Sequence, residues 1–227
     1  RFSQCIHQWL GINRAVCVLQ GYTQGVSTGS TFQFIRIVLK ERIDGMDIPS
    51  RELNELSLFS GYGGYTLGLR LAGINIRTVC YVENDPYAQQ VLQQRFGDGL
   101  DSAPIWDDIT TFDPEPWKGH VDIVSAGFPC QPHSHAGSRL GEIDPRNLWP
   151  QTREIIRLVG CKYIVLENVP GILSGNDGRQ GYGISVLGDI SELGFDARWG
   201  IYSASNAGAP HLRKRWWVLA YTNTDHG

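Results

Sequence analysis

The chain has 227 residues, 41% of them hydrophobic, and a formal net charge of −3 at pH 7. This composition is typical of a folded globular protein with one sizeable core, and it excludes general disorder and the strongly basic character of many nucleic-acid-binding domains. No apolar run approaches the ~20 residues of a membrane-spanning helix, and the five cysteines include no C-x-x-C pair, which argues against a disulfide framework and favours a reducing compartment.

The first 54 residues are expected to form an N-terminal extension. Residues 14–20 and 31–39 have the composition of short strands, whereas residues 40–55 are polar, contain Gly45 and Pro49, and are typical of a linker. The chain begins with Arg1 rather than Met and ends directly after a strand-like run, so we expect a fragment of a longer protein. Residues 55–227 are expected to form the main domain.

From residue 55 onward, strand-like and helix-like segments alternate. This alternation predicts an α/β fold with a doubly wound, mostly parallel sheet. The expected strands are residues 56–59, 78–82, 121–126, 163–166 and 216–220, and the expected helices are residues 66–72, 86–96, 147–158 and 183–193.

A glycine-rich turn, Phe59 to Gly64, follows the first of these strands. Glycines there allow a sharp bend and the close approach of a ligand. Glu83 ends the second strand, where a carboxylate can accept the ribose hydroxyls of a nucleoside cofactor. Asp108 follows a third short strand at residues 104–106 and is placed to meet an adenine amino group. An alternative is that the glycines only shape a turn.

The glycine spacing differs from the dinucleotide-binding fingerprint, because Thr66 occupies its third glycine position. S-adenosylmethionine has no pyrophosphate and does not need that spacing. The departure therefore favours a methyl donor over a dinucleotide.

Cys130 lies between Pro129 and Pro132, after a buried-type strand at residues 121–126. A stiffened loop at the carboxyl edge of the sheet is suited to aiming a nucleophile. A zinc site at Cys130, His133 and His135 lacks an evident fourth ligand, so we expect no metal. A zinc deaminase is set aside as well, because its second cysteine and its H-x-E motif are missing.

Glu167 ends another buried-type strand, at residues 163–166, and its carboxylate is expected at the same edge as the cysteine. A carboxylate there can hold or donate a proton, although a helix-capping role is an alternative. Arg213 and Arg215 occupy alternate positions of an extended segment and would point to one side. They lie in residues 197–224, which carry four basic and no acidic side chains. The alternative for this pair is a solvated basic edge.

In this order, the motifs between residues 55 and 221 resemble those of the DNA cytosine-5 methyltransferase family. The most specific are the Pro-Cys-Gln and Glu-Asn-Val segments. The full set comprises Phe59 to Gly64, Glu83-Asn84-Asp85, Asp108-Ile109, Gly127 to Gln131, Asp144-x-Arg146, Glu167-Asn168-Val169 and Arg213-x-Arg215.

The resemblance implies the Rossmann-like fold of S-adenosylmethionine-dependent methyltransferases and a covalent mechanism on a flipped-out base. Cys130 would attack carbon 6 of cytosine, and carbon 5 would then take the methyl group. Glu167 would hold ring nitrogen 3 and the exocyclic amine, while Arg215, with Arg213, would bind the base oxygen. Loss of the carbon-5 proton would release the cysteine.

The resemblance also implies a set of binding residues. Gln131 and Ser134 match positions near the DNA phosphates. The S-adenosylmethionine site would comprise Phe59, Gly61, Gly63, Gly64, Glu83, Asp108, Ile109, Phe128, Pro129 and Leu148.

Several positions depart from the family pattern. His211-Leu212 stands where a glutamine is usual before Arg-x-Arg, Arg146-Asn147 replaces Arg-Gly, and His133 occupies a commonly apolar position. The target-recognition region that the family places after the Arg-x-Arg strand is not in the sequence, and residues 1–50 match nothing in the family.

The resemblance implies double-stranded DNA as substrate, a monomeric protein with no membrane association, and a cytoplasmic location in a prokaryote or phage-infected host. A cognate restriction endonuclease is a further expected partner. Two alternatives stay open. One is a catalytically incompetent fragment that binds cofactor or DNA, and the other is a tRNA cytosine-5 methyltransferase.

Overall fold

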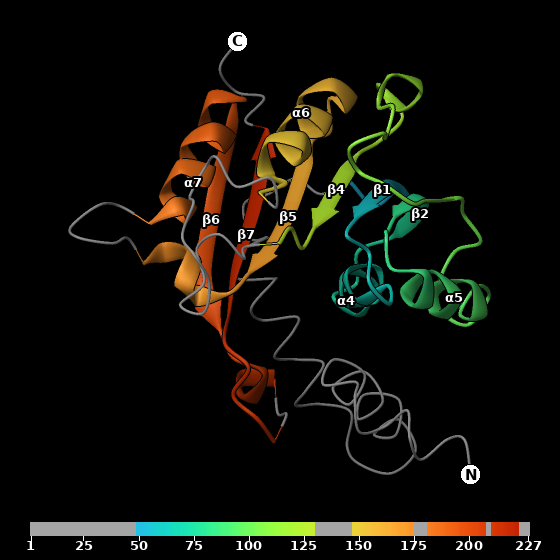
Figure 1. The fold of residues 1–227 in the computed structure, drawn as a ribbon, viewed down its shortest axis with the longest axis horizontal. Helices are drawn as coiled ribbons and strands as arrows, with labels where there is room; N and C mark the ends of the chain where they lie inside the picture. The colour runs from blue at the N-terminus through green and yellow to red at the C-terminus, as the bar shows by residue number, and fades with distance from the viewer. Residues whose placement is uncertain (1–48, 130–146, 175–180, 208–209, 223–227) are drawn as a thin grey trace.

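The structure is a computed structural model and describes residues 49–129, 147–174, 181–207 and 210–222. The short strands expected at residues 14–20 and 31–39 lie outside these ranges. The described residues form a seven-stranded sheet with the order β3-β2-β1-β4-β5-β7-β6 (Figure 1).

The strands and helices alternate along the described chain, as the sequence predicts. In chain order they are β1 (Leu53–Leu58), α4 (Gly64–Leu71), β2 (Ile76–Val82), α5 (Pro86–Gln94), β3 (Ile105–Trp106), β4 (Ile123–Ala126), α6 (Trp149–Val159), β5 (Tyr163–Asn168), α7 (Tyr182–Glu192), β6 (Phe195–Tyr202) and β7 (Arg215–Thr222). Short 3-10 turns at Glu115–Trp117, Pro170–Leu173 and Ala204–Ala207 complete the set.

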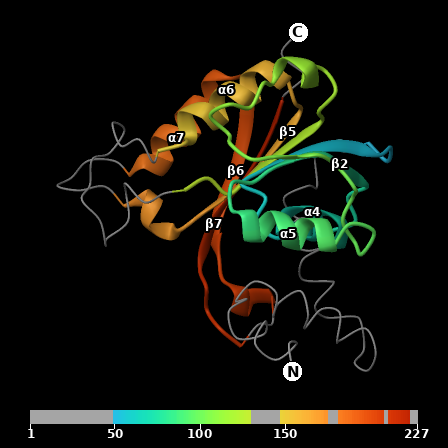
Figure 2. The same ribbon diagram turned by 45° about the vertical axis from the view of Figure 1, so that its right-hand side comes forward.

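Helices cover both faces of the sheet, with α4 and α5 on one side and α6 and α7 on the other (Figures 1 and 2). Successive residues of the buried strands point alternately to the two helical layers. On β5, Ile164 and Leu166 join the core beneath α6 and α7, whereas Tyr163 and Val165 join the core that includes Leu69 of α4. A mostly parallel, doubly wound sheet is therefore confirmed, because each buried strand presents apolar side chains to two layers of helices.

Most neighbouring strands are parallel. The sheet extends from β1 to β2 and β3 on one side, and to β4 and the later strands on the other. β1 pairs in parallel with β2 on one side and with β4 on the other, and β4 pairs in parallel with β5. The strand order reverses between β1 and β4, and open α/β sheets place their ligands at the carboxyl ends of the strands beside such a reversal.

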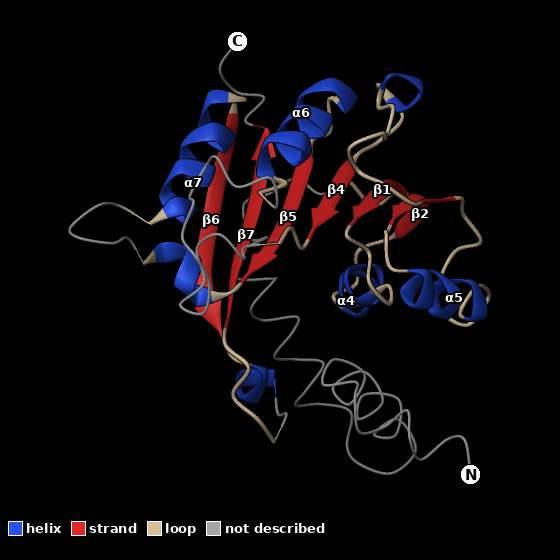
Figure 3. Ribbon diagram, in the orientation of Figure 1, coloured by secondary structure: helices blue, strands red, loops and turns tan. Residues whose placement is uncertain are grey.

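Two strands differ from the expectation. β6 (Phe195–Tyr202) was not predicted; it pairs antiparallel with β7, which pairs antiparallel with β5 (Figure 3). β6 is an edge strand whose apolar residues alternate with polar ones in the sequence, although Trp199 and Ile201 are exposed in the structure. β1 begins at Leu53, and the polar segment 40–55 is therefore not a linker at its end.

Glu55 of β1 is completely buried, and its carboxylate accepts hydrogen bonds from hydroxyl groups of three other elements. Thr66 of α4 and Thr78 of β2 donate to Oε2, each over 2.7 Å, and Ser125 of β4 donates to Oε1 over 2.7 Å. A buried polar group is tolerated when it is hydrogen-bonded in this way. The carboxylate thus joins α4 to the centre of the sheet.

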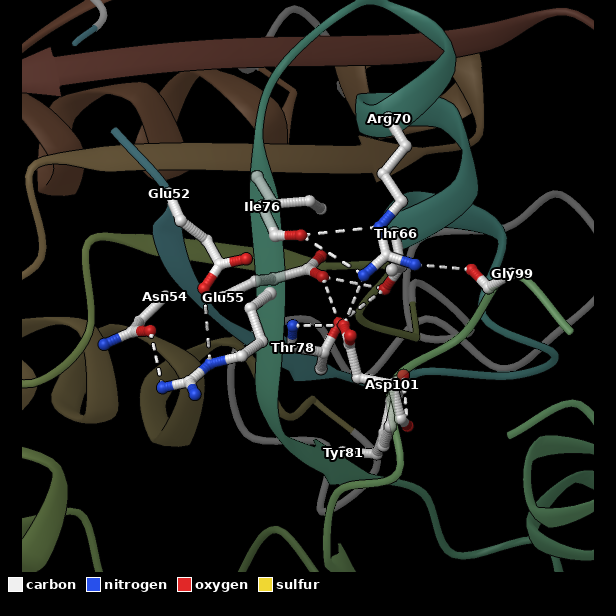
Figure 4. Close-up of polar contacts among 11 residues, drawn as sticks. Glu52, Asn54, Glu55, Thr66, Arg70, Ile76, Thr78, Tyr81, Gly99 and Asp101 are labelled. Atoms are coloured by element: carbon white, nitrogen blue, oxygen red, sulfur yellow. Dashed lines mark hydrogen bonds and ion pairs between the residues drawn. The ribbon is translucent and has the colours of Figure 1, made fainter. Parts of the chain in front are cut away.

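Asp101 lies next to this group and ties the segment before β3 to the same region (Figure 4). Its Oδ2 accepts hydrogen bonds from the backbone N–H of Thr78 over 2.7 Å and from Nη2 of Arg70 over 2.5 Å. Arg70, in the last turn of α4, also donates to the carbonyl of Gly99 over 2.7 Å. Both ends of α4 are therefore held by polar contacts.

Within the described ranges, no helix is long and apolar enough to cross a membrane.

Glu55 provides a test of this arrangement through the pH dependence of stability. Burial raises the pKa of Glu55 above its ordinary value of 4.5, so its contribution to stability is complete in acid and is lost as pH rises through the folded-state pKa. For Glu55→Gln we expect a protein less stable by about 1–3 kcal/mol in acid, because the amide nitrogen, unlike either oxygen of the protonated carboxyl group, cannot accept a hydrogen bond from a neighbouring hydroxyl. The deficit should shrink as pH rises.

Urea unfolding at a series of pH values measures this difference. The matched control is Glu52→Gln, which removes a carboxylate with a 54% exposed side chain from the residue just before β1. Parallel stability curves for wild type and Glu55→Gln between pH 4 and pH 8 would contradict the assignment.

Candidate active site

The carboxyl ends of β1, β2, β4 and β5 meet at one edge of the sheet and bring the predicted motifs together. The glycine turn follows β1, Glu83 follows β2, residues 127–129 follow β4, and Glu167 lies near the end of β5.

The glycine turn has an unusual backbone. Phe59, Gly61 and Gly63 have φ values of 52°, 53° and 78°, in the left-handed region that favours glycine. Phe59 is not a glycine, so its conformation is strained, a feature that clusters at binding sites. A Cβ at Gly61 would meet no atom within 4 Å, whereas one at Gly63 would lie 2.6 Å from Leu100. The open space at Gly61 leaves the backbone accessible to a ligand.

Glu83 closes this turn against β2. Its Oε2 accepts a hydrogen bond from the backbone N–H of Gly61 over 2.7 Å, and its Oε1 accepts one from the N–H of Asp85 over 2.9 Å. The residue is 9% exposed. A carboxylate has about four lone-pair positions, so each oxygen of Glu83 retains acceptor capacity for a pair of hydroxyl groups. These residues therefore fit a cofactor that carries a ribose.

Asp108 and Ile109 lie beyond β3, on the same side of the switch point. The Oδ1 of Asp108 accepts hydrogen bonds from the backbone N–H and the hydroxyl of Thr110, over 2.8 and 2.7 Å. These bonds lower the pKa of Asp108 below its ordinary value. Asp108 is exposed and Ile109 is buried, so the carboxylate is the group of the pair that is free to meet a solvent-borne ligand.

Phe128 and Leu148, two of the predicted cofactor-binding residues, pack against the core. The side chain of Phe128 is 3% exposed and packs on Trp149, with ring centroids 5.1 Å apart. The carbonyl of Phe128 accepts a hydrogen bond from Nδ2 of Asn168 over 2.9 Å, which fixes the segment after β4 against β5. Leu148 precedes α6 and packs against the same core.

Glu167 and Arg215 form an ion pair at the edge of the site, with Nε of Arg215 2.6 Å from Oε1 of Glu167. The hydroxyl of Tyr65 donates to the other oxygen, Oε2, over 3.2 Å. The two side chains of the pair are about one-fifth exposed. An arginine–carboxylate pair that is partly shielded from water has a fixed geometry, so the carboxylate is oriented before any substrate arrives.

Arg213 lies within the electrostatic influence of the same carboxylate. Its φ of 32° shows that residues 213–215 are not one extended segment, so that part of the sequence prediction is wrong. Its side chain nevertheless interacts electrostatically with Glu167 and with Arg215. Partial desolvation and the like charge of Arg215 lower the pKa of Arg213.

Cys130, Gln131 and Ser134 lie outside the described residues. So do His133 and His135, which the alternative zinc-site hypothesis would need as ligands. Among the described residues, no cluster of histidine, cysteine, aspartate and glutamate has the arrangement of a metal site. The structure places the stem that leads to Cys130, at residues 127–129, next to Tyr65 and Asn168.

Two residues of this site were not singled out from the sequence. Tyr65 follows the glycine motif and carries no signal of its own, because an aromatic residue at the start of a helix usually belongs to the core. Asn168 is part of the Glu-Asn-Val motif, and its position next to Glu167 was the available signal.

The chain is similar to several curated bacterial and viral enzymes. It is 31% identical over 176 residues to the Type II methyltransferase M.NgoMIV of Neisseria gonorrhoeae, which covers 76% of this chain and 53% of that protein. It is 30% identical over 211 residues to M.MspI of Moraxella sp, covering 91% and 47%. The second match is too long to fit within residues 53–227, so it includes part of the N-terminal segment. The chain spans about half the length of these relatives.

Solved structures show the same architecture. A crystal structure of a Spodoptera frugiperda DNMT2 mutant aligns with a TM-score of 0.62 and 25% identity, covering 77% of this chain and 51% of that one. A putative DNA modification methyltransferase from an Escherichia coli prophage aligns with a TM-score of 0.60 and 27% identity, covering 75% and 47%.

The family model described as C-5 cytosine-specific DNA methylase matches residues 53–226, which contain all the described strands and helices. The chain therefore belongs to the C-5 cytosine-specific DNA methylase family.

Proposed function

We propose that this chain is the catalytic part of an enzyme that transfers a methyl group from S-adenosylmethionine to carbon 5 of cytosine in DNA. The observation that carries the proposal is the family match over residues 53–226, together with the Glu167–Arg215 pair at the same sheet edge as the glycine turn. The names of the Type II relatives support DNA as the substrate class. They also support a restriction endonuclease as a companion activity and a cytoplasmic location.

The cofactor would lie across the carboxyl ends of β1 and β2 and supply the methyl group. Glu83 would accept the ribose hydroxyls, and the turn from Phe59 through Gly61, Gly63 and Gly64 would let the cofactor approach the backbone. Asp108 and Ile109 would meet the adenine. Phe128 would contribute through its backbone because its ring is buried, with Pro129 and Leu148 beside it.

The reaction proposed for the site begins with a cytosine flipped out of the duplex. The thiolate of Cys130 adds to carbon 6, which makes carbon 5 electron-rich and able to take the methyl group. A base then removes the carbon-5 proton, and the electron pair of that bond expels the cysteine. Dividing one hard substitution into two steps is covalent catalysis.

In this scheme Glu167 and Arg215 act on the edge of the base. The carboxylate of Glu167 binds ring nitrogen 3 and the exocyclic amine, and the guanidinium of Arg215, with Arg213, binds the base oxygen. The ion pair between Glu167 and Arg215 supports this role, because donors and acceptors that are held in place need little rearrangement in the transition state. Gln131 and Ser134 would contact DNA phosphates.

Cys130→Ser tests the nucleophile. We expect loss of methyl transfer to DNA, because a serine hydroxyl is not ionised near neutral pH, while cofactor binding is retained. The assay uses labelled S-adenosylmethionine with mixed-sequence DNA, on this chain and on any longer gene product that contains it. Cys5→Ser, in the N-terminal extension, is the control and should remain active.

DNA that carries 5-fluorocytosine gives a second measurement. Carbon 5 then bears fluorine instead of a proton, so the cysteine cannot be expelled and a covalent complex should accumulate with wild type but not with Cys130→Ser. Turnover by Cys130→Ser would refute the nucleophile. Transfer to tRNA but not to DNA would assign the RNA substrate, and absence of any transfer would favour an incompetent fragment.

Glu83→Ala tests the cofactor site. Loss of the charged acceptor should weaken S-adenosylmethionine binding by about 10-fold to 100-fold, the equivalent of about 1.5–3 kcal/mol. Titration calorimetry measures the Kd. Asp98→Ala, which removes an exposed carboxylate after α5, is the control. An unchanged Kd for Glu83→Ala would reject the ribose contact.

A further inference from the structure

We propose that Tyr65 is a positioning residue of this site, whose hydroxyl orients the Glu167 carboxylate and at the same time seats the chain segment that leads from β4 to Cys130. The proposal rests on the proposed function, since it concerns how Glu167 would meet the base. Tyr65 is the second residue of α4, and its side chain contacts Glu167 of β5 and Gly127, which follows β4.

The two oxygens of Glu167 are held by donors from different elements. Nε of Arg215, on β7, lies 2.6 Å from Oε1, and the hydroxyl of Tyr65, on α4, donates to Oε2 over 3.2 Å. One contact alone would leave the carboxylate free to rotate about its terminal bond, which is a soft torsion. An ion pair at Oε1 and a hydrogen bond at Oε2 together restrain that rotation, and each oxygen keeps further acceptor capacity for a base edge.

The ring of Tyr65 is held in place as well. It packs edge-to-face against Trp217 of β7, with ring centroids 6.1 Å apart. Aromatic pairs at this separation and angle are favourable beyond the area that they bury. The phenol therefore cannot swing away from Glu167 without losing its contact with β7.

The hydroxyl of Tyr65 also lies against the backbone of Gly127. A Cβ built at Gly127 would be 2.3 Å from the hydroxyl oxygen, a distance that real side chains do not show. Gly127 follows directly on β4 and precedes Pro129 by two residues. The phenol thus fills the space that a side chain at Gly127 would occupy, and it contacts the stem of the cysteine segment.

The protonation state of Tyr65 suits a donor. Burial and the negative charge of Glu167 raise the pKa of Tyr65 well above its ordinary value of 10. The phenol therefore stays protonated at neutral pH and can only donate to the carboxylate. The other charged groups that face it are Arg213 and Arg215, whose positive charges oppose this rise.

The backbone at Tyr65 is held in place by the contacts of its neighbours in α4. The next residue, Thr66, donates to the buried carboxylate of Glu55 over 2.7 Å. The preceding residues, Gly63 and Gly64, end the glycine turn. Tyr65 therefore connects the proposed cofactor turn, the base-binding carboxylate and the cysteine segment through one rigid side chain.

Tyr65→Phe tests the hydroxyl while keeping the ring. We expect methyl transfer to fall about tenfold or more in kcat, the equivalent of losing one hydrogen bond to a charged group, with the Kd for S-adenosylmethionine within about twofold of wild type. The control is Tyr221→Phe, at the opposite end of β7, which should keep wild-type kcat. An active wild type with an equally active Tyr65→Phe would overturn the proposal.

A second measurement does not depend on activity. In protein labelled with carbon-13 at the tyrosine Cζ, the Tyr65 signal is identified by its absence from Tyr65→Phe. Glu167→Gln removes the charged acceptor beside the phenol, so the Cζ chemical shift of Tyr65 at neutral pH should change. An unchanged chemical shift would overturn the contact with Glu167, whereas an inactive wild type in which this chemical shift changes would reject the proposed function and retain the contact.

Gly127→Ala tests the contact with the cysteine segment. The added methyl group should clash with the hydroxyl and lower the Tm by about 2–10 °C. In the Tyr65→Phe background the nearest ring atom is 3.3 Å away, so the same change should lower the Tm less. Gly188→Ala, where a Cβ meets no atom within 4 Å, is the control. Equal losses in both backgrounds would overturn the seating role of the hydroxyl.

Discussion

The site depends on the hydrogen bonds of the buried Glu55 side chain. Glu55 lies within β1, and its carboxyl oxygens accept hydrogen bonds from hydroxyl groups of α4, β2 and β4. A carboxylate without partners in this position would be very costly, since desolvation disfavours its charged form. With three donors it becomes a fixed point that sets α4 relative to the strands. The glycine turn and Tyr65 are both within a few residues of Thr66, so their positions follow from this contact.

The second constraint is the reversal of strand order between β1 and β4. The ends of four parallel strands meet at one edge, beside the reversal where such sheets bind their ligands. The glycine turn and Glu83 follow β1 and β2 on one side of the reversal, and Glu167 with Arg215, on β5 and β7, lies on the other. A two-substrate reaction is compatible with such a division, because a nucleoside cofactor and a nucleobase could approach from opposite sides. Tyr65 follows the glycine turn and donates to Glu167, so it connects the two sides. A shift of the glycine turn would therefore change the orientation of the Glu167 carboxylate.

Much of this arrangement could be predicted from the sequence. The strand–helix alternation identified the parallel sheet, and Glu83 and Glu167 were found because each follows a run of apolar residues that ends at the active edge. Other features depended on tertiary contacts that no local pattern carries. β6 was missed although apolar residues alternate with polar ones from Phe195 to Ile201, so a local signal for this strand was available. Glu55 resembled part of a polar linker, because its three hydroxyl partners come from distant segments.

We propose that the site methylates carbon 5 of cytosine, and mass spectrometry of the reaction product would locate the methyl group. After incubation with S-adenosylmethionine, duplex DNA would be digested to nucleosides and the position of the added methyl group identified. We expect 5-methyldeoxycytidine together with an equal amount of S-adenosylhomocysteine. A methyl group on the exocyclic nitrogen of cytosine, or on adenine, would refute methylation at carbon 5.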